Sequence, residues 1–153
     1  MSELAFPDTE NKEIRRKAMD LLARREHSVA ELRHKLLSKG YSEPAVDEQL
    51  RRLEQENLLS DQRFAEAYVS FRSKKGFGPV RIQQELKQKG IDAALAEQYL
   101  DNNDYWRNIA KEVREKRFGD TLPKDYTDIA KQMRFLQYRG FSNEQLRHLF
   151  DSE

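Results

Sequence analysis

Three glycines spaced fifty residues apart constrain the fold of this chain more than any other feature of its sequence. Gly40, Gly90 and Gly140 lie in the segments KGYS, KGID and RGFS, so each follows a basic residue and precedes an apolar one. A leucine lies four residues before each glycine. Repetition at a fixed spacing indicates one structural unit copied along the chain, and the sequence therefore predicts three tandem repeats.

Each glycine is expected to end one helix and open a turn into the next. Glycine adopts the left-handed conformation readily after a helix, and the apolar residue that follows can then contact the preceding leucine. The next residue can cap the following helix; these residues are Ser42, Asp92 and Ser142. Ser28 with Glu31, and Ser142 with Gln145, fit the capping box, and Pro79 suits a first helical position.

Another amphipathic helix is predicted before each pair of helices that a glycine turn joins, because apolar residues recur there at helical spacing. The predicted buried faces are Ile14, Ala18, Leu21 and Leu22; then Phe64, Ala67, Tyr68 and Phe71; then Ile109, Ala110 and Val113. Helices are expected near 11–25, 28–39, 42–57, 60–74, 79–89, 92–103, 104–117, 124–138 and 142–151. The predicted fold class is all-α, with three tandem three-helix repeats forming an elongated, curved array.

The predicted organisation has four parts. A flexible N-terminal tail covers 1–12, and the three repeats cover 13–58, 59–103 and 104–153. In the third repeat a longer loop, Phe118 to Pro123, separates the first helix from the second and shifts that helix along the sequence. A three-helix unit of this size holds few apolar residues, so neighbouring repeats are expected to share burial.

Composition excludes several classes of protein. The 153 residues include 28 Lys and Arg against 27 Asp and Glu, so no global charge excess marks a nucleic-acid or membrane binder. Cysteine is absent, which excludes a disulfide framework and fits a reducing cytoplasm. No apolar stretch approaches the length of a membrane span, and the acidic N-terminus resembles no signal peptide. We expect a cytoplasmic monomer without membrane association.

The residues needed for catalysis or cofactor binding are missing. The histidines, His27, His34 and His148, lack the spacing of a helical zinc site, and we expect ordinary surface or capping roles for them. Gly76 and Gly78 form an isolated G-x-G without a preceding strand. Carboxylates lie among bases at helical spacings, which is typical of solvated faces. We therefore expect no enzymatic activity, no cofactor and no metal.

The densest local charge lies between Arg72 and Gly90, where six bases accompany one acid. Such a band can attract an acidic protein surface or a phosphate backbone. Several of its bases lie in last turns, where cations also stabilise the helix dipole, so a purely structural role stays open for them. Arg81 lies in the first turn of its helix, where the helix dipole disfavours a cation, so the dipole does not explain this residue. An acidic segment, Glu43 to Asp61, precedes the band.

Two helix faces extend this candidate surface. Arg81, Gln84 and Gln88 share a stripe opposite the apolar Ile82 and Leu86, and such a stripe suits hydrogen bonding to a partner. Phe77, between two glycines, is expected to staple the following helix, with an exposed anchor as the alternative. Lys131, Arg134 and Tyr138 share another helix face, which is basic and aromatic. The candidate partner-binding residues are Arg72, Lys74, Lys75, Arg81, Gln84, Lys87, Gln88, Lys89, Lys131, Arg134 and Arg139.

These segments resemble the RecX family of regulatory proteins. SDQRFAEAYVSFRSKKGFGPVRIQQELKQKGI, residues 60–91, resembles the central RecX signature, with its D-x-R-F-A start, its K-G-F-G-P turn and its closing K-G-I. ARREHSVAELRHKLLSKG, residues 23–40, resembles the opening repeat, and FLQYRGF, residues 135–141, the final one. The resemblance covers nearly the whole chain after about residue 12.

The resemblance implies a partner and an activity. RecX proteins bind the RecA filament on single-stranded DNA and inhibit its strand exchange, ATP hydrolysis and coprotease function, which links them to recombinational repair and the SOS response. Two alternatives remain open at this point. Helix, turn, helix also describes direct DNA readers, so the basic band could contact single- or double-stranded DNA. A nuclease-like enzyme would need a carboxylate cluster that the sequence lacks.

Overall fold

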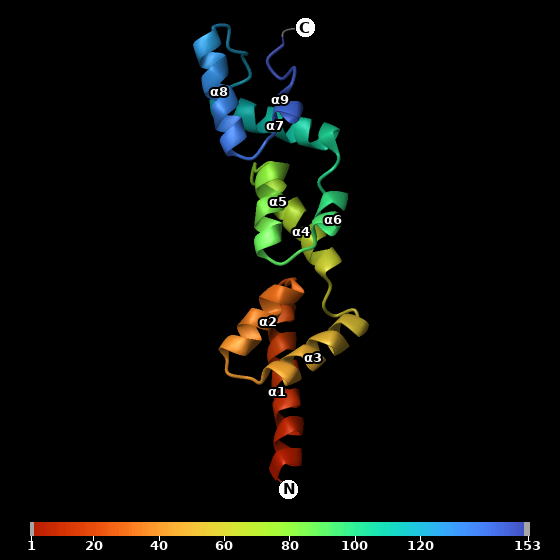
Figure 1. Cartoon of the computed structure of the whole chain (residues 1–153). Coiled ribbons are helices and arrows are strands. Elements are labelled where there is room, and N and C mark those ends of the chain that lie inside the picture. Colours follow the sequence, from red (N-terminus) through yellow and green to blue (C-terminus); the bar gives the residue numbers. More distant parts are fainter. Residues whose placement is uncertain (1, 152–153) are drawn as a thin grey trace. The chain divides into compact units, whose positions relative to one another are not determined.

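The computed structural model describes residues 2–151, with side chains from residue 8 onward, and within that range it contains helices and no strand (Figure 1). This agrees with the predicted all-α class. The helices of this range are α1 Ser2–Arg24, α2 Val29–Ser38, α3 Glu43–Gln55, α4 Asp61–Lys74, α5 Pro79–Gln88, α6 Ala93–Gln98, α7 Asn103–Phe118, α8 Tyr126–Tyr138 and α9 Asn143–Leu146. The expected helices α6 and α9 are shorter than their sequence pattern predicted.

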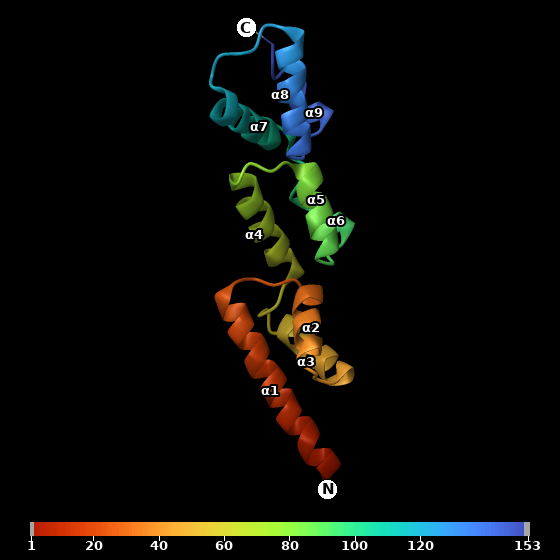
Figure 2. The ribbon, with the colours of Figure 1, turned by 90° about the vertical axis from the view of Figure 1, so that its left-hand side faces the viewer.

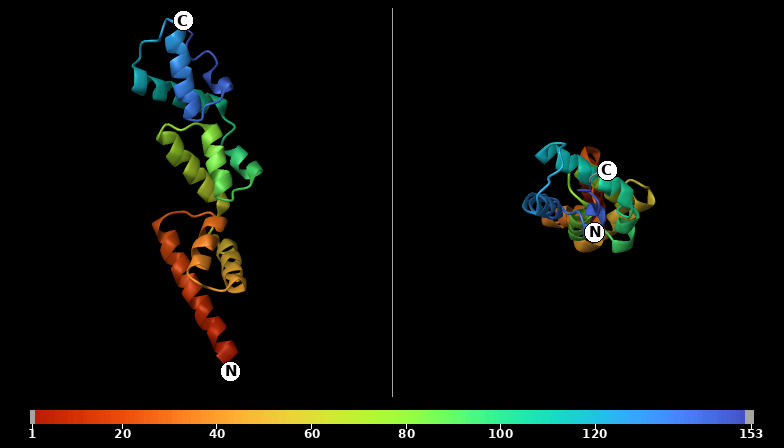
Figure 3. Two further views of the ribbon diagram at one scale, coloured as in Figure 1. Left: turned by 60° about the vertical axis from the view of Figure 1, so that its left-hand side comes forward. Right: turned by 90° about the horizontal axis from the view of Figure 1, so that it is seen from above.

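Packing divides the chain into two compact units, and the division falls inside α4. The first unit comprises Met1–Ala67 with Lys89–Ile91, and the second comprises Tyr68–Gln88 with Asp92–Glu153. In the first unit α1 lies against α2 and α3 (Figure 2). In the second unit α5 packs on α6, while α7, α8 and α9 contact one another (Figure 3).

The core of the first unit joins one face of each of its three complete helices. Ile14 and Ala18 on α1 are fully buried, as their spacing of four residues predicted. They pack with Leu32, Leu36, Val46, Leu50, Leu53 and Leu59. Each fully buried Leu, Ile or Val side chain stabilises the fold by roughly 2 kcal/mol relative to an exposed one, so this cluster holds the three helices together.

Helix α1 begins at Ser2, so the prediction of a helix start near residue 11 was wrong. The expected tail, 1–12, is helical from Ser2 onward within the described range. Glu10 gives a physical reason for order near the end of this segment. Its carboxylate accepts hydrogen bonds from the backbone N–H and the hydroxyl of Ser42, both at 2.9 Å. The Ser42 hydroxyl makes no capping bond to α3.

The core of the second unit surrounds a buried tryptophan. Trp106 of α7 is fully buried, and its indole N–H donates to the carbonyl of Leu100 at 3.1 Å. The other fully or nearly buried apolar residues of this unit are Val69, Ile82, Leu86, Ala96, Leu100, Ala110, Leu136, Phe141 and Leu146. Ile109 and Val113, predicted to share the buried face with Ala110, are only half-buried.

The predicted face of α4 was partly wrong. Phe64 is buried, but the other buried apolar residues of this helix are Ala65 and Val69, while Ala67 is exposed and Phe71 is 49% exposed. The reason is visible in the sequence. Apolar residues cover a broad arc of this helix, so periodicity alone cannot select the part of that arc that packs.

The three glycine turns are equivalent in backbone conformation, as their spacing predicted. Gly40, Gly90 and Gly140 have φ angles of 92°, 80° and 105°, all in the left-handed region. The capping boxes at Ser28 and Ser142 are both formed. Asp92 likewise caps α6. Local sequence chemistry therefore fixes where most of these helices begin and end.

Inside the first unit, the start of α2 contacts the turn at residues 89–91. The hydroxyl of Ser28 donates to the carbonyl of Lys89 at 2.7 Å. A Cβ atom at Gly90 would lie 2.6 Å from the Cβ of Ala30, which is closer than real contacts allow. Only glycine therefore permits this approach.

Inside the second unit a similar contact lies fifty residues later, between the start of α5 and the turn at residues 139–141. The backbone N–H of Gly78 donates to the carbonyl of Arg139 at 2.8 Å, and that of Val80 donates to Gly140 at 2.9 Å. A Cβ atom at Gly140 would lie 2.5 Å from the Cβ of Arg81. In each unit the start of a helix thus covers a turn glycine, although the atoms in contact differ.

The junction of the first unit contains several charged side chains around His27. His27 is only 1% exposed, so its predicted surface or capping role was wrong. One ring nitrogen lies 3.2 Å from the carbonyl of Arg25 and the other 2.8 Å from the ammonium of Lys35. Burial is the main cause that lowers the pKa of His27, which favours the neutral ring beside the Lys35 cation.

Glu31 supplies the negative charge of this junction. Burial by itself would raise the pKa of Glu31, but the hydrogen bonds and charge of Arg25 and the charge of Lys89 outweigh it and lower the pKa to about 2. Glu31 therefore remains ionised well below the pH at which an ordinary glutamate takes up a proton.

Replacing the turn glycines should separate conformational strain from steric exclusion. Gly40→Ala meets no atom within 4 Å, so we expect only the cost of a left-handed alanine, about 1 kcal/mol. Gly140→Ala adds the clash with Arg81 and should cost about 3 kcal/mol or more. Urea unfolding followed by circular dichroism measures both. Equal losses for the two variants would contradict the junction geometry.

Removing the charge of Glu31 should give a pH-dependent loss of stability. Glu31→Gln keeps a side chain able to form the capping box but loses the ion pairs, so we expect a loss of about 1 kcal/mol near neutral pH. Because the pKa is depressed from 4.5 to about 2, this stabilisation is present above 4.5 and disappears as the pH falls toward 2. Urea titrations of both proteins at several pH values measure the difference. The exposed Glu13→Gln is the control, and a difference that persists at the acid end would refute the assignment.

Candidate partner-binding surface

The turn between α4 and α5 sets up the candidate surface. Gly76 has a φ of 90°, which ends α4, and Gly78 lies against the backbone of Gly140. A Cβ atom at Gly78 would come within 2.5 Å of that backbone, so a side chain is excluded there. Phe77, between these two glycines, is thereby held at the junction of the second unit.

Three arginines surround the ring of Phe77. The guanidinium carbons of Arg72, Arg81 and Arg139 lie 4.0, 4.4 and 5.0 Å from the ring centroid. These distances are typical of cation–π contacts. Phe77 is half-buried. We call Phe77 with these three arginines the Phe77 cluster.

A single carboxylate neutralises part of the Phe77 cluster. Glu85 accepts hydrogen bonds at 2.9 Å from Arg72 and from the hydroxyl of Tyr68, and one at 3.3 Å from Arg81. Burial opposes ionisation of Glu85, but these donors keep its pKa below the ordinary value. Burial and the neighbouring carboxylate raise the pKa of Tyr68 to about 12. One negative charge faces three guanidinium groups, so the cluster stays cationic.

A basic groove of about 540 Å³ continues from the Phe77 cluster. Its apolar floor includes Ile109, Val113 and Phe135. Its charged residues are five cations and one acid: Lys74, Lys75, Lys116, Arg117, Arg139 and Glu112. The guanidinium carbon of Arg117 lies 5.5 Å from the Phe135 ring centroid. We call this hollow the basic groove. None of its lysines forms an ion pair with a residue in the described range 2–151.

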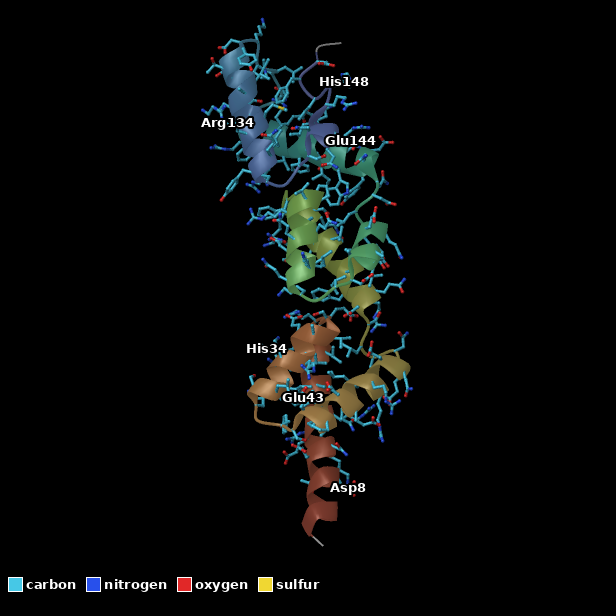
Figure 4. All side chains as sticks on the ribbon, viewed as in Figure 1. Asp8, His34, Glu43, Arg134, Glu144 and His148 are labelled. Carbon is cyan, nitrogen blue, oxygen red and sulfur yellow. The ribbon has the colours of Figure 1, made fainter. Side chains whose placement is uncertain are left out.

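The structure brings together five of the eleven residues that the sequence singled out. Arg72, Arg81 and Arg139 form the Phe77 cluster, and Lys74 and Lys75 line the basic groove with Arg139. Gln84, Lys87 and Gln88 are exposed on α5 beyond the groove lining. Lys131 and Arg134 are exposed on α8, where Arg134 is labelled in Figure 4.

Lys89 lies apart from the other candidates. It belongs to the first unit, where its ammonium is 3.6 Å from the carboxylate of Glu31 and its carbonyl accepts from Ser28. Conversely, sequence reasoning missed Lys116 and Arg117 of α7. The sequence feature that could have identified these two residues is the run K-R-F at the end of α7, next to the longer loop of the third repeat.

Equivalent positions in the two junctions carry different charges. His27 corresponds to Phe77, and Glu31 corresponds to Arg81, each fifty residues apart. In the first junction the acid at position 31 pairs with Arg25 and Lys89. In the second junction a guanidinium occupies that position, and the neighbouring turn adds another from Arg139. The cationic character of the second junction therefore comes from side chains on a shared backbone geometry.

Two further features are absent from the described part of the chain. No group of three or more His, Cys, Asp and Glu side chains there could hold a metal ion. None of the helices described combines the length and the apolar character that crossing a bilayer requires.

Comparison with known proteins identifies the family. Family models of the first, second and third RecX three-helix domains match residues 15–53, 60–100 and 104–150. The chain is 43% identical to "Regulatory protein RecX" of Pseudomonas savastanoi pv. phaseolicola over 137 residues, covering 89% of this chain and 88% of the relative. The corresponding protein of Pseudomonas entomophila is 42% identical with the same coverage.

Solved structures show the same fold. A crystal structure of RecX from Lactobacillus salivarius superposes with a TM-score of 0.81 at 23% identity, covering 93% of this chain and 95% of the other. Another crystal structure of a regulatory protein RecX gives the same TM-score at 22% identity, covering 95% and 74%. With three matching domains in order and close relatives over most of its length, this chain belongs to the RecX family of regulatory proteins.

Proposed function

We propose that this protein binds the RecA filament in the cytoplasm and inhibits its recombinase, ATPase and coprotease activities, which would restrain homologous recombination and the SOS response. Membership of the RecX family supports the choice of partner. The observation that carries the proposal is the basic groove beside the Phe77 cluster, because it is a preformed cationic surface. Lys74 and Lys75 bring the segment that most resembles the RecX signature to its edge.

The basic groove suits a protein partner with acidic side chains. Five cations face one carboxylate, so the surface attracts negative charge and accelerates encounter. The apolar floor at Ile109, Val113 and Phe135 adds a surface that a protein side chain can cover. A nucleic-acid backbone would use the cations but gain little from this floor.

The exposed residues around the groove complete the proposed surface. Gln84, Lys87 and Gln88 extend it along α5, and Lys131 and Arg134 extend it along α8. Lys89 is left out, because its charge is engaged by Glu31 in the first unit. The proposed contribution of the outer residues is mainly to orientation and association rate, since exposed rim charges contribute little affinity.

The proposal is tested with RecA on single-stranded DNA. The purified protein should lower ATP hydrolysis by RecA, and Lys75→Glu with Lys116→Glu should raise the concentration needed for half inhibition about tenfold or more. The control is Lys12→Glu with Arg16→Glu, an equal charge change at exposed positions of α1. Failure of the unaltered protein to inhibit at excess would refute RecA as partner. Equal inhibition by both double variants would refute the basic groove as contact.

A salt titration without RecA addresses the DNA alternative. We expect weak binding to single- and double-stranded DNA that is lost steeply as salt rises, because only a few cations are available for phosphate contacts. Fluorescence anisotropy of labelled oligonucleotides measures this. Tight binding that survives physiological salt, and that Lys75→Glu with Lys116→Glu abolishes, would favour a direct DNA reader instead.

A further inference from the structure

Two aromatic rings hold the guanidinium of Arg139 in the lining of the basic groove. Its guanidinium carbon lies 5.0 Å from the ring centroid of Phe77 and 5.3 Å from that of Phe135. Both distances lie within the range of cation–π contacts. Contact with two rings restricts the rotation of this side chain, so a partner that binds it has less freedom left to remove.

The turn at Gly76 gives this guanidinium a place against the backbone. The Nη1 atom of Arg139 donates to the carbonyl of Lys75 at 3.4 Å. A Cβ atom at Gly76 would lie 3.4 Å from the same Nη1 and 3.1 Å from a methyl carbon of Val113. A residue with a side chain would therefore crowd this position, and glycine leaves the room that Arg139 uses.

Most of the hydrogen-bonding capacity of Arg139 is unused within the described residues. Among residues 2–151, no carboxylate forms an ion pair with it. Its bond to the carbonyl of Lys75 uses one of the five N–H groups that a guanidinium offers. Arg139 is only partly buried and lines the basic groove, so a partner can reach it there. Its remaining N–H groups are therefore available for binding.

The neighbouring Arg72 shows how a guanidinium on the Phe77 ring binds a carboxylate. Its guanidinium carbon lies 4.0 Å from the ring centroid, and its Nε and Nη2 both donate to Glu85 at 2.9 Å. The ring thus contacts the guanidinium while the carboxylate accepts two parallel hydrogen bonds from its edge. Arg139 makes the same contact with Phe77 and lacks the carboxylate, so it represents half of this arrangement.

The repeat pattern singles out the same residue. The residue before the turn glycine is Lys39 in the first repeat and Lys89 in the second, whereas the third repeat has Arg139. A lysine ammonium is a point charge and cannot offer the paired donors of a guanidinium. The arginine therefore occurs at the turn whose side chain lines the basic groove.

We propose that Arg139 is the anchor of the basic groove and binds a glutamate or aspartate side chain of the protein partner through two parallel hydrogen bonds. Its partner is the RecA filament, so the anchor rests on the proposed function. The apolar floor at Ile109, Val113 and Phe135 favours a carboxylate on a protein over a phosphate chain, because a protein supplies apolar side chains to cover it. The exposed lysines of the groove attract the acid, and Arg139 fixes its position.

Nitrogen-15 NMR of the arginine Nε–H groups tests the anchor on the intact protein without RecA. The probe is the tripeptide acetyl-Leu-Glu-Leu amide, and its matched control is acetyl-Leu-Gln-Leu amide, which lacks the carboxylate. The Arg139 signal should shift and saturate with the first peptide and remain in place with the second. The exposed Arg16 on α1 is the internal reference. A shift without saturation would overturn the anchor, and tighter saturation by inorganic phosphate would overturn the choice of a carboxylate.

Inhibition of RecA measures what the paired donors contribute. Arg139→Lys keeps the positive charge and loses the fork, so it should raise the concentration for half inhibition of ATP hydrolysis about tenfold. Arg134→Lys is the same exchange at an exposed arginine of α8 and should change that concentration by less than about twofold. Circular dichroism establishes that both variants are folded. Equal inhibition by the two variants would contradict the role of Arg139.

The two assays separate the anchor from the proposed function. Saturable binding of the glutamate peptide at Arg139 by a protein that does not inhibit RecA would refute the partner and leave the anchor standing. Inhibition of RecA that Arg139→Lys leaves intact would refute the anchor and leave the partner standing. A purely structural role for Arg139 predicts a lower thermal unfolding midpoint for Arg139→Lys with unchanged inhibition by the folded protein, and that result would also overturn the anchor.

Discussion

The close approach of two backbones at the junctions is the constraint on which the rest of this structure depends. Hydrogen bonds run from Gly78 and Val80 to the turn at residues 139–141, and the room for them exists only because Gly78 and Gly140 lack a Cβ atom. This contact holds Phe77 in place. The guanidinium groups of Arg72, Arg81 and Arg139 lie around its ring. Gly90 plays the same part beside Ala30 in the first unit.

The two junctions resemble each other in backbone conformation, but their side chains differ. Glu31 is the acid of the first junction and pairs with Arg25 and Lys89, whereas Glu85 is the acid of the second and pairs with Arg72 and Arg81. The second junction also holds Phe77, whose ring is in contact with three guanidinium groups, and it lies beside the basic groove. The proposed contact with a recombinase filament therefore rests on these side chains rather than on the helical repeat alone.

Much of the fold was predictable from the sequence, because it depends on local rules. Glycines that accept a positive φ, caps such as Ser28, and apolar residues at helical spacing act within a few neighbouring residues. The buried face of α4 was not predictable, since its apolar residues cover a broad arc of which only part packs. The buried state of His27 also could not be inferred, because its partners Arg25 and Lys35 show their role only once the helices are packed.

The candidate surface was predictable only in part, for a related reason. Arg72 and Arg81 are close in sequence, and their charge density was visible there. Lys116 and Arg117 line the same groove from α7. A longer loop follows this helix, so its distance along the sequence from the turn glycine differs from that in the other repeats. Which distant cations come together depends on that distance, and no single segment of the sequence reveals it.

Gly40 differs from the other two turn glycines in its surroundings. No described atom lies within 4 Å of where its Cβ would be, whereas Gly90 and Gly140 are both covered by the start of a helix. The first turn therefore requires only a residue that accepts the left-handed backbone, while the other two turns also exclude any side chain by contact. Asparagine, which enters that conformation at low cost, is consequently compatible with the first turn and incompatible with the other two.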